Sequence, residues 1–390
     1  MIHNGWASQR TRAMPASMFR TMDVAKTEAR RRGLEVIDLS LGSSDLPASP
    51  AVVDALCRAV QDPQTHGYCM HSATRPLREA AAAWYWRRYQ GQLDPREVLV
   101  LIGSQEGFAH LLLAVTDPGD TVLIPDPGYP SYFQMVALCG LNTVTMPLLE
   151  ENNFLPDLAA IPAEVARQAK VMVLSYPNNP TSAVATYQFF QEVVDFCRSY
   201  HILLIHDFPY VDMVYGDYEA PSILSVPGSM DVAVELYTCS KSYHMGGFRI
   251  GWAAGNPDAI QALAQVKSAV DFNPYLGIQQ AAIVALNQPR SETRRAAQIF
   301  EQRRNVLVAE MNAVGWRTRL PQASMYVWTH VPGGLTDSFD FAVNLCKETG
   351  VALAPGRGFG ERGEGFVRIA LVREPDVLRE AVRRIQSFLD

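Results

Sequence analysis

Polar and charged side chains follow the ends of five apolar runs in the first two-thirds of the sequence. Together they offer a lysine, a carboxylate, two phenols, a carboxamide, several hydroxyls and glycine-rich backbone. This set suits carbonyl chemistry, and no metal-ligand cluster or Ser-His-Asp set in the sequence is as convincing. The segments are Gly103-Ser104-Gln105, Asp126-Pro127-Gly128-Tyr129, Pro177-Asn178-Asn179-Pro180, Asp207-Phe208-Pro209-Tyr210 and Thr238-Cys239-Ser240-Lys241.

Lys241 has the most informative neighbours in this set. A lone lysine in a loop is usually a solvated surface charge. Here it follows a predicted strand and precedes a segment of small and polar residues that ends at Arg249. A lysine withdrawn from water near other cations can form a Schiff base with a carbonyl group. Arg249 could hold a phosphate through two parallel hydrogen bonds.

Asp207, Asn179 and Tyr129 each have a structural alternative. Asp207 could cap a following helix, or it could pair with a protonated pyridine nitrogen and keep that ring an electron sink. Asn179 precedes a proline and could be only a turn former. Tyr129 could be an aromatic residue of a turn, packed on the core. Their occurrence together at successive strand ends favours the functional hypothesis.

The elements that position these residues alternate between strands and helices. Helical spacing over residues 107–115, 132–139 and 187–200 separates several of the apolar runs, which predicts parallel βαβ units and a doubly wound sheet. Ligands of such sheets bind beyond the carboxyl ends of the strands. The predicted buried strands are Val98–Ile102, Thr121–Pro125, Val171–Tyr176, Ile202–His206 and Val232–Tyr237.

The rhythm changes in the last third of the sequence, which predicts a smaller α+β domain. Helices are predicted over 257–270, 291–314 and 374–389, and strands over 324–330, 351–354 and 366–372. We therefore expect three parts: an N-terminal segment, 1–45, that packs with the small domain, a large cofactor-binding domain, 46–285, and a small C-terminal domain, 286–390.

Composition excludes several other classes of protein. The net charge is −6 and the basic residues are scattered, so nucleic acid is an unexpected partner. No apolar run is long enough to span a bilayer. The six cysteines lie far apart without a Cys-x-x-Cys pair, which predicts neither a zinc site nor a disulfide framework. We expect a cytoplasmic protein without a metal site.

The segment that contains the lysine resembles a known motif. Ser240 to Gly251, SKSYHMGGFRIG, is similar to the cofactor-lysine motif of class I/II aminotransferases, which are pyridoxal-phosphate (PLP) enzymes of fold type I. Asn179-Pro180-Thr181 resembles their Asn-Pro-Thr-Gly motif. The resemblance extends nearly end to end and looks strongest to the alanine (glutamate–pyruvate) and LL-diaminopimelate aminotransferase-like branch. That branch is indicated by His66-Gly67-Tyr68, Ile102-Gly103-Ser104-Gln105-Glu106-Gly107 and Ala323-Ser324-Met325-Tyr326-Val327-Trp328.

The resemblance implies a role for each matching residue. Lys241 would carry PLP as a Schiff base, and Asp207 would bind the pyridine nitrogen. Tyr129 would stack on the ring, while Tyr210 and Asn179 contact its hydroxyl group. Arg368 would bind the substrate α-carboxylate in a pocket that Gly42 also lines. The implied phosphate ligands are Gly103, Ser104, Gln105, Thr238 and Arg249, with Tyr68 reaching the phosphate of the other subunit's cofactor in a homodimer whose active sites lie at the subunit interface.

The implied activity is transamination between an L-amino acid and a 2-oxo acid by a ping-pong mechanism, as part of amino-acid metabolism and biosynthesis. Lys241 would be the general base and then the general acid. Alanine or glutamate with pyruvate or 2-oxoglutarate is the expected substrate pair, with LL-diaminopimelate as the alternative. A PLP-dependent β-lyase or decarboxylase would share every cofactor residue. A cofactor-binding regulator would place a DNA-binding module first, which we do not expect here.

Four residues depart from the family pattern. Ser182 stands where a glycine or alanine follows Asn-Pro-Thr, Pro209 replaces a small residue, and Phe248 replaces a tryptophan. None of these changes removes a functional group. Ser17 stands where the alanine-type enzymes have a tyrosine at the substrate entrance, so the donor specificity is left open.

Overall fold

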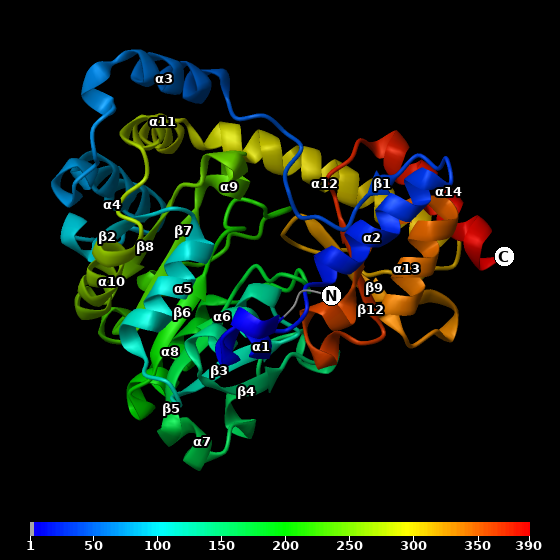
Figure 1. Ribbon diagram of the computed structural model, residues 1–390, viewed down its shortest axis with the longest axis horizontal. Helices are drawn as coiled ribbons and strands as arrows, with labels where there is room; N and C mark the ends of the chain where they lie inside the picture. Colours follow the sequence, from blue (N-terminus) through cyan, green and yellow to red (C-terminus); the bar gives the residue numbers. More distant parts are fainter. Residues whose placement is uncertain (1–3) are drawn as a thin grey trace.

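A seven-stranded, mostly parallel sheet lies at the centre of the computed structural model, which describes residues 4–390 (Figure 1). The strand order is β2-β8-β7-β6-β5-β3-β4; only β8 runs antiparallel to its two neighbours. The doubly wound sheet expected from the sequence is confirmed. The strands are β2 (Val98–Leu101), β3 (Thr121–Asp126), β4 (Asn142–Pro147), β5 (Ala169–Leu174), β6 (Leu203–Asp207), β7 (Ala233–Thr238) and β8 (Gly251–Gly255).

Helices cover both faces of this sheet because its strands are apolar on both sides. In β2, Val98 and Val100 pack toward α4 and α11, whereas Leu99 and Leu101 pack toward α5 and α10. The period of two thus assigns successive side chains to opposite faces. The helices are α3 (Pro50–Gln61), α4 (Arg75–Tyr89), α5 (Ser104–Val115), α6 (Pro130–Cys139), α7 (Ala163–Gln168), α8 (Tyr187–Tyr200), α10 (Pro257–Val270) and α11 (Leu276–Asn287).

Strands β4 and β8 were not predicted from the sequence. β4 is an edge strand with exposed polar side chains, and β8 reads Gly-Trp-Ala-Ala-Gly, a composition depleted in strand formers. The close packing of β8 explains its composition. A Cβ atom added at Gly251 would lie 2.2 Å from the carbonyl oxygen of Tyr237, and one at Gly255 would lie 2.2 Å from that of Ala233. Small residues are therefore required there.

A second core lies between the C-terminal helices and a three-stranded antiparallel sheet of order β11-β12-β9. The strand β1 (Ile37–Asp38) pairs in parallel with β10 (Val351–Ala352), and α2 (Met18–Arg31) packs against α13. The proposed boundaries at 45 and 285 stay a prediction. The other elements are β9 (Tyr326–His330), β11 (Ala354–Pro355), β12 (Phe366–Ala370), α12 (Arg290–Ala313), α13 (Ser338–Thr349) and α14 (Pro375–Leu389).

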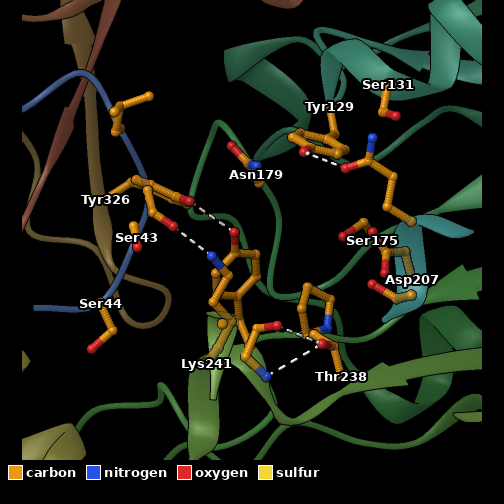
Figure 2. Close-up of a pocket in the computed structure, with 18 of the residues that line it drawn as sticks. Ser43, Ser44, Tyr129, Ser131, Ser175, Asn179, Asp207, Thr238, Lys241 and Tyr326 are labelled. Carbon is orange, nitrogen blue, oxygen red and sulfur yellow. Dashed lines mark hydrogen bonds between the residues drawn. The ribbon is translucent and has the colours of Figure 1, made fainter. Parts of the chain in front are cut away.

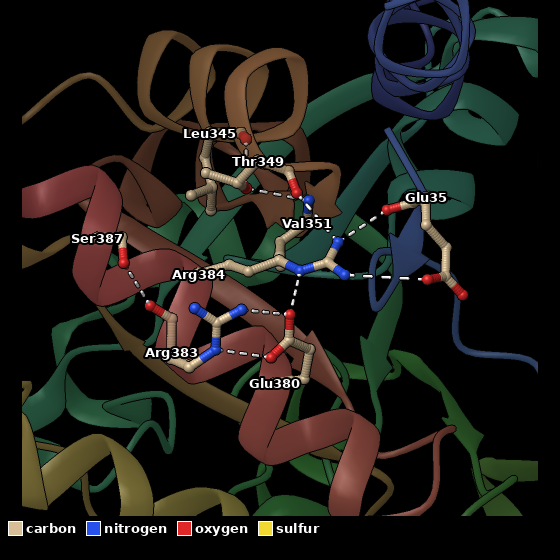
Figure 3. A network of polar contacts seen from close by, with 8 residues as sticks. All are labelled: Glu35, Leu345, Thr349, Val351, Glu380, Arg383, Arg384 and Ser387. Carbon is tan, nitrogen blue, oxygen red and sulfur yellow. Dashed lines mark hydrogen bonds and ion pairs between the residues drawn. The ribbon is translucent and has the colours of Figure 1, made fainter. Parts of the chain in front are cut away.

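Arg384 on α14 fixes the chain that leads from α2 toward the large sheet (Figure 3). Its guanidinium donates to the carbonyl oxygens of Glu35 at 2.9 Å and Thr349 at 3.2 Å, and to the carboxylate of Glu380 at 2.6 Å. Glu380 also accepts from Arg383, and these hydrogen bonds lower its pKa to about 2. These contacts hold the chain just before β1 against α14 and the end of α13. No helix within residues 4–390 has the length and apolar composition needed to cross a membrane.

Candidate active site

A cavity of about 470 Å³ opens beyond the carboxyl ends of the central strands (Figure 2). It collects residues from the sheet, from the segment after β1 and from β12. Of the expected site residues, all except Gly103 and Tyr68 line it, so the structure brings together side chains that are up to 326 positions apart, from Gly42 to Arg368. Those that line it are Gly42, Ser104, Gln105, Tyr129, Asn179, Asp207, Tyr210, Thr238, Lys241, Arg249 and Arg368.

Lys241 lies in the short helix α9 (Cys239–Ser242), directly after β7. Thr238 caps this helix by accepting a hydrogen bond from the backbone N–H of Ser240 at 3.2 Å. The Lys241 Nζ atom donates to the carbonyl oxygen of Gly42 and lies 5.9 Å from the centre of the Tyr210 ring. Figure 2 shows the side chain reaching across the cavity toward the segment that contains Ser43. Within residues 4–390, the contact with Gly42 is the one hydrogen bond that the amine makes.

Asp207 ends β6 and is 9% exposed. Its Oδ2 atom accepts a hydrogen bond from the Tyr132 hydroxyl at 2.7 Å, whereas its Oδ1 atom has no hydrogen-bond partner among residues 4–390. Burial raises the pKa of this carboxyl. The helix-cap alternative for Asp207 is wrong, because the next helical turn begins only at Ile223. An unpartnered buried acceptor fits a cationic N–H group placed in the cavity.

The turn between β2 and α5 has the features of an anion site. Gly103 precedes the first turn of α5 with φ +83°, and the helix N-terminus presents free backbone N–H groups. The Arg249 guanidinium packs against this turn by donating to the carbonyl oxygen of Ile102 at 3.4 Å, and it also donates to the carbonyl oxygen of Gly246 at 3.0 Å. A Cβ atom at Gly103 would lie 2.7 Å from Arg249 Nη2. Only glycine leaves room for this approach.

We expect Gly103→Ala to weaken phosphate binding beyond its cost in stability. The added methyl group must displace Arg249, and the Gly103 backbone at φ 83°, ψ 159° lies in a region essentially restricted to glycine, which costs a residue with a Cβ atom about 1–3 kcal/mol. Gly33→Ala is the matched control, since Gly33 has φ +80° and open space around its Cβ position. Both variants should lose stability in thermal denaturation of the apoprotein, because both glycines have positive φ. Only Gly103→Ala should lose affinity for inorganic phosphate and PLP in titrations, and equal affinities in both variants would contradict this assignment.

Arg368 on β12 is buried at the opposite side of the cavity. It donates to the side-chain oxygen of Asn179 and to the carbonyl oxygen of Ser40, each at 2.8 Å. Its Nε atom has no hydrogen-bond partner among the described residues. The turn role considered for Asn179 belongs to its neighbour Asn178, whose side chain accepts from Thr181. Arg368 is thus a buried cation with hydrogen-bonding capacity to spare, as binding a carboxylate requires.

Tyr326 is a cavity residue that was not assigned from the sequence, although it lies in a motif that indicated the branch. Its hydroxyl hydrogen-bonds that of Tyr210 at 2.8 Å, and its ring lies 4.1 Å from the Arg368 guanidinium carbon. Burial acts to raise the pKa of Tyr326, but the positive charges of Arg368 and Lys241 outweigh it and the pKa is lowered. A Cβ atom at Gly42 would collide with the Tyr326 hydroxyl, which explains the glycine at this wall.

Other lining residues also escaped sequence reasoning. His244, with φ +56°, hydrogen-bonds the Ser44 hydroxyl at 2.8 Å, and burial lowers its pKa to about 4. It is therefore neutral at pH 7. The sequence signal for most of these lining residues was their place in or next to a segment already singled out, such as the lysine motif, the turn after β2 or the turn that contains Tyr129. The residues are Phe19, Leu41, Ser43, Ser44, Phe108, Ser131, Tyr132, Ser175, Ser240, His244, Gly246, Gly247 and Tyr326.

The departures from the family pattern have structural consequences. Ser182 adopts φ +60° and its hydroxyl contacts the Ser324 hydroxyl at 2.7 Å and the Tyr326 carbonyl oxygen at 2.8 Å. It thus joins the Asn179 loop to β9. Pro209 lines the cavity. Phe248 is partly buried and packs against the hydrophobic cluster between the large sheet and helices α4 and α11.

Tyr68 lies outside the cavity and is 91% exposed. Its ring centre is 6.1 Å from that of Phe272. Its expected role requires a second subunit, so that role stays a prediction.

Three potential metal ligands, Glu106, His110 and Asp271, gather at the outer side of α5. The buried ammonium of Lys267 lies between them, 3.0 Å from Glu106 and 3.1 Å from Asp271. This cation pairs with both carboxylates and lies where a metal ion would have to bind, so the cluster does not indicate a metal site.

Comparisons with known proteins agree with this geometry. A family model described as aminotransferase class I and II matches residues 35–385. The LL-diaminopimelate aminotransferase of Moorella thermoacetica is 43% identical over 383 residues, which cover 98% of each chain. The glutamate-pyruvate aminotransferase AlaC of Escherichia coli is 41% identical over 378 residues, 96% of this chain and 92% of that protein.

A solved structure is similar in both fold and sequence. It is a probable N-succinyldiaminopimelate aminotransferase from Thermus thermophilus, with a TM-score of 0.91 and 48% identity. The match covers 95% of this chain and 100% of that one.

Proposed function

This chain belongs to the class I and II aminotransferases, a PLP-dependent family of fold type I, and from that premise we propose that its amino donor is LL-diaminopimelate. The observation that carries the proposal is the composition of the cavity wall. Arg368 is available for the α-carboxylate, while Ser43, Ser44 and neutral His244 supply polar groups without a further full charge. Neutral donors and acceptors suit a distal end that carries both an ammonium and a carboxylate group. A distal carboxylate alone would favour a second cation.

The residues present fit the family's cofactor. The unpartnered Asp207 Oδ1 atom would accept a hydrogen bond from the protonated pyridine nitrogen, and Tyr129 would stack on the ring. Gly103 and Arg249 would hold the phosphate together with the start of α5. The remaining proposed ligands are Ser104, Gln105, Thr238, Asn179 and Tyr210.

PLP, when bound, supplies a conjugated cationic ring that withdraws the electrons released when the Cα–H bond breaks. We propose that Arg368 fixes the α-carboxylate, so that the Cα–H bond stands over Lys241. Lys241 Nζ then removes the proton and later returns one, acting as base and then acid. Tyr210, which is held by Tyr326, would donate a hydrogen bond to the ring hydroxyl. Asn179 accepts a hydrogen bond from Arg368 and would also contact the ring, which would couple carboxylate binding to cofactor alignment.

Alanine or glutamate as donor, with pyruvate or 2-oxoglutarate as acceptor, is the second candidate. The glutamate-pyruvate aminotransferase of E. coli favours this candidate. The sequence alone led us to expect alanine or glutamate first and LL-diaminopimelate second. We reverse that ranking because several relatives are named LL-diaminopimelate aminotransferases. The β-lyase hypothesis gains no support from the aminotransferase relatives described above.

A donor panel tests the choice directly. With 2-oxoglutarate as acceptor, we expect kcat/KM for LL-diaminopimelate to exceed that for alanine and glutamate by at least about tenfold, a difference of about 1.4 kcal/mol in transition-state binding. N-succinyl-LL-diaminopimelate belongs in the same panel. Equal or higher values for alanine would favour the second candidate, whereas no conversion of PLP to its pyridoxamine form with any donor would refute transamination itself.

We also propose a homodimer in a reducing compartment such as the cytoplasm. Tyr68, Met70 and Phe272 are exposed apolar side chains, the rings of Tyr68 and Phe272 lie 6.1 Å apart, and all six cysteines are free. Tyr68 would reach the phosphate of the partner's cofactor. A fully active monomer in sedimentation, or export of the protein in cell fractionation, would contradict these two proposals.

A further inference from the structure

Tyr132 contacts both groups that would hold the cofactor ring. Its hydroxyl donates to Asp207 Oδ2 at 2.7 Å, and its ring lies 5.7 Å from that of Tyr129 in an edge-to-face arrangement. The two tyrosines are three residues apart at the start of α6, where the Tyr132 N–H donates to the Tyr129 carbonyl oxygen at 2.9 Å. One helical turn therefore directs both phenols to the same side.

The Asp207–Tyr132 hydrogen bond is buried at the wall of the cavity. Tyr132 is 2% exposed and packs on Phe108, with a ring distance of 5.0 Å. Burial raises the pKa of Tyr132, so its hydroxyl remains a neutral donor at any physiological pH. A neutral donor stabilises the ionised carboxylate without cancelling its charge. It also determines which carboxylate oxygen is occupied and which one faces the cavity.

We propose that Tyr132 is a positioning residue that keeps Asp207 ionised and presents its free Oδ1 atom to the ring nitrogen. The inference rests on the role proposed for Asp207. Without the Tyr132 hydroxyl, one of the hydrogen bonds that lower the pKa of Asp207 would be lost, so burial would raise that pKa further. Asp207 would then take the proton from the ring nitrogen. The ring would then lose the positive charge that makes it an electron sink.

Tyr132→Phe tests this proposal because it keeps the ring packing and removes only the hydroxyl. We expect the PLP dissociation constant of the apoprotein to rise roughly 10- to 100-fold, in line with loss of a hydrogen bond to a charged group. A charged ring nitrogen makes the lysine–cofactor linkage easier to deprotonate. The pH midpoint of the visible absorption band should therefore rise by about one unit in the variant.

Tyr85→Phe is the matched control. Tyr85 is also a buried phenol, and it donates to the carboxylate of Glu235 at 2.9 Å, away from the cavity. Both variants should lose similar thermal stability, but only Tyr132→Phe should change PLP affinity and the absorption midpoint. Equal changes in both variants, or a loss of stability alone in Tyr132→Phe, would assign Tyr132 a merely structural role and overturn the proposal.

Two further measurements separate this inference from the proposed role of Asp207. If Tyr132 acts through Asp207, adding Tyr132→Phe to the Asp207→Asn variant should change neither the PLP affinity nor the absorption midpoint any further. If Asp207→Asn itself changed neither readout, the Asp207 assignment would be refuted. If Asp207→Asn changed them and Tyr132→Phe did not, only the positioning role of Tyr132 would be refuted.

Site-specific 3-fluorotyrosine at position 132, a stronger hydrogen-bond donor of nearly the same shape as tyrosine, should move the absorption midpoint to lower pH. This measurement decides the question if Tyr132→Phe does not fold, because an unchanged or raised midpoint would overturn the proposal.

Discussion

Lys241→Ala is expected to reduce transamination by at least about 10³-fold while leaving a folded chain that still binds PLP without a covalent bond. The loss removes the base that takes the Cα proton, a contribution of roughly 10² to 10⁴ in rate, and also the covalent attachment. Folding should be preserved because, in the part of the chain that the structure describes, the Lys241 ammonium makes one hydrogen bond, to Gly42. Single-turnover absorbance with a saturating amino donor measures the effect on chemistry alone.

Lys170→Ala is the control for Lys241→Ala, since Lys170 is an exposed lysine on β5 outside the cavity. It should retain wild-type rates. An added small primary amine should restore part of the activity of Lys241→Ala but not alter Lys170→Ala, because only the former lacks a base at the reacting carbon. A rate for Lys241→Ala within tenfold of the wild type would contradict the assignment of the base.

Arg368→Met is expected to lower kcat/KM for amino acids by roughly 30- to 5,000-fold, the range found when one partner of a buried charge pair is removed. Methionine fills much of the volume but cannot bind the α-carboxylate. The variant also leaves Asn179 and the Ser40 carbonyl oxygen without a donor, which costs about 1–3 kcal/mol in stability for each group. Steady-state kinetics and thermal denaturation measure the two effects separately.

A substrate analogue without a carboxylate provides the control for Arg368→Met. A primary amine of matched chain length should react slowly and at similar rates with the wild type and the variant, since neither can use Arg368 for it. If the variant lost activity equally toward the amine and the amino acid, the arginine would be supporting the cavity rather than binding the carboxylate. Arg368 would then lose its proposed role.

The sequence predicted the sheet and the residues at its strand ends because both follow from local patterns. Apolar runs predicted five of the strands; Asp207 ends one of them, and Lys241 lies three residues after the end of another. Parallel strands bring their carboxyl ends to one edge, so these residues had to converge. Arg368 was placed only through the family resemblance, since nothing local to β12 relates it to Asn179, 189 positions earlier.

The rest of the site depends on contacts between distant segments. Tyr326 could be assigned only from the structure, in which β9 places its hydroxyl against that of Tyr210. Tyr132 likewise required the structure, in which α6 places its hydroxyl against Asp207. Strand β8 was not predicted because glycine and alanine have low strand propensity. Close packing against β7 nevertheless requires small residues there. Tyr68 would complete a site across a subunit boundary, which one chain does not contain.

Borohydride reduction followed by peptide mapping tests the central claim most directly. Reduction of the PLP-loaded protein fixes the cofactor to the amine that carries it, and proteolysis with mass spectrometry then locates the modified residue. We predict a single pyridoxyl adduct, on Lys241 in the segment Ser240-Lys241-Ser242. An adduct on another lysine, or no adduct in a protein that converts amino donors, would contradict the assignment of Lys241 and with it the proposed active site.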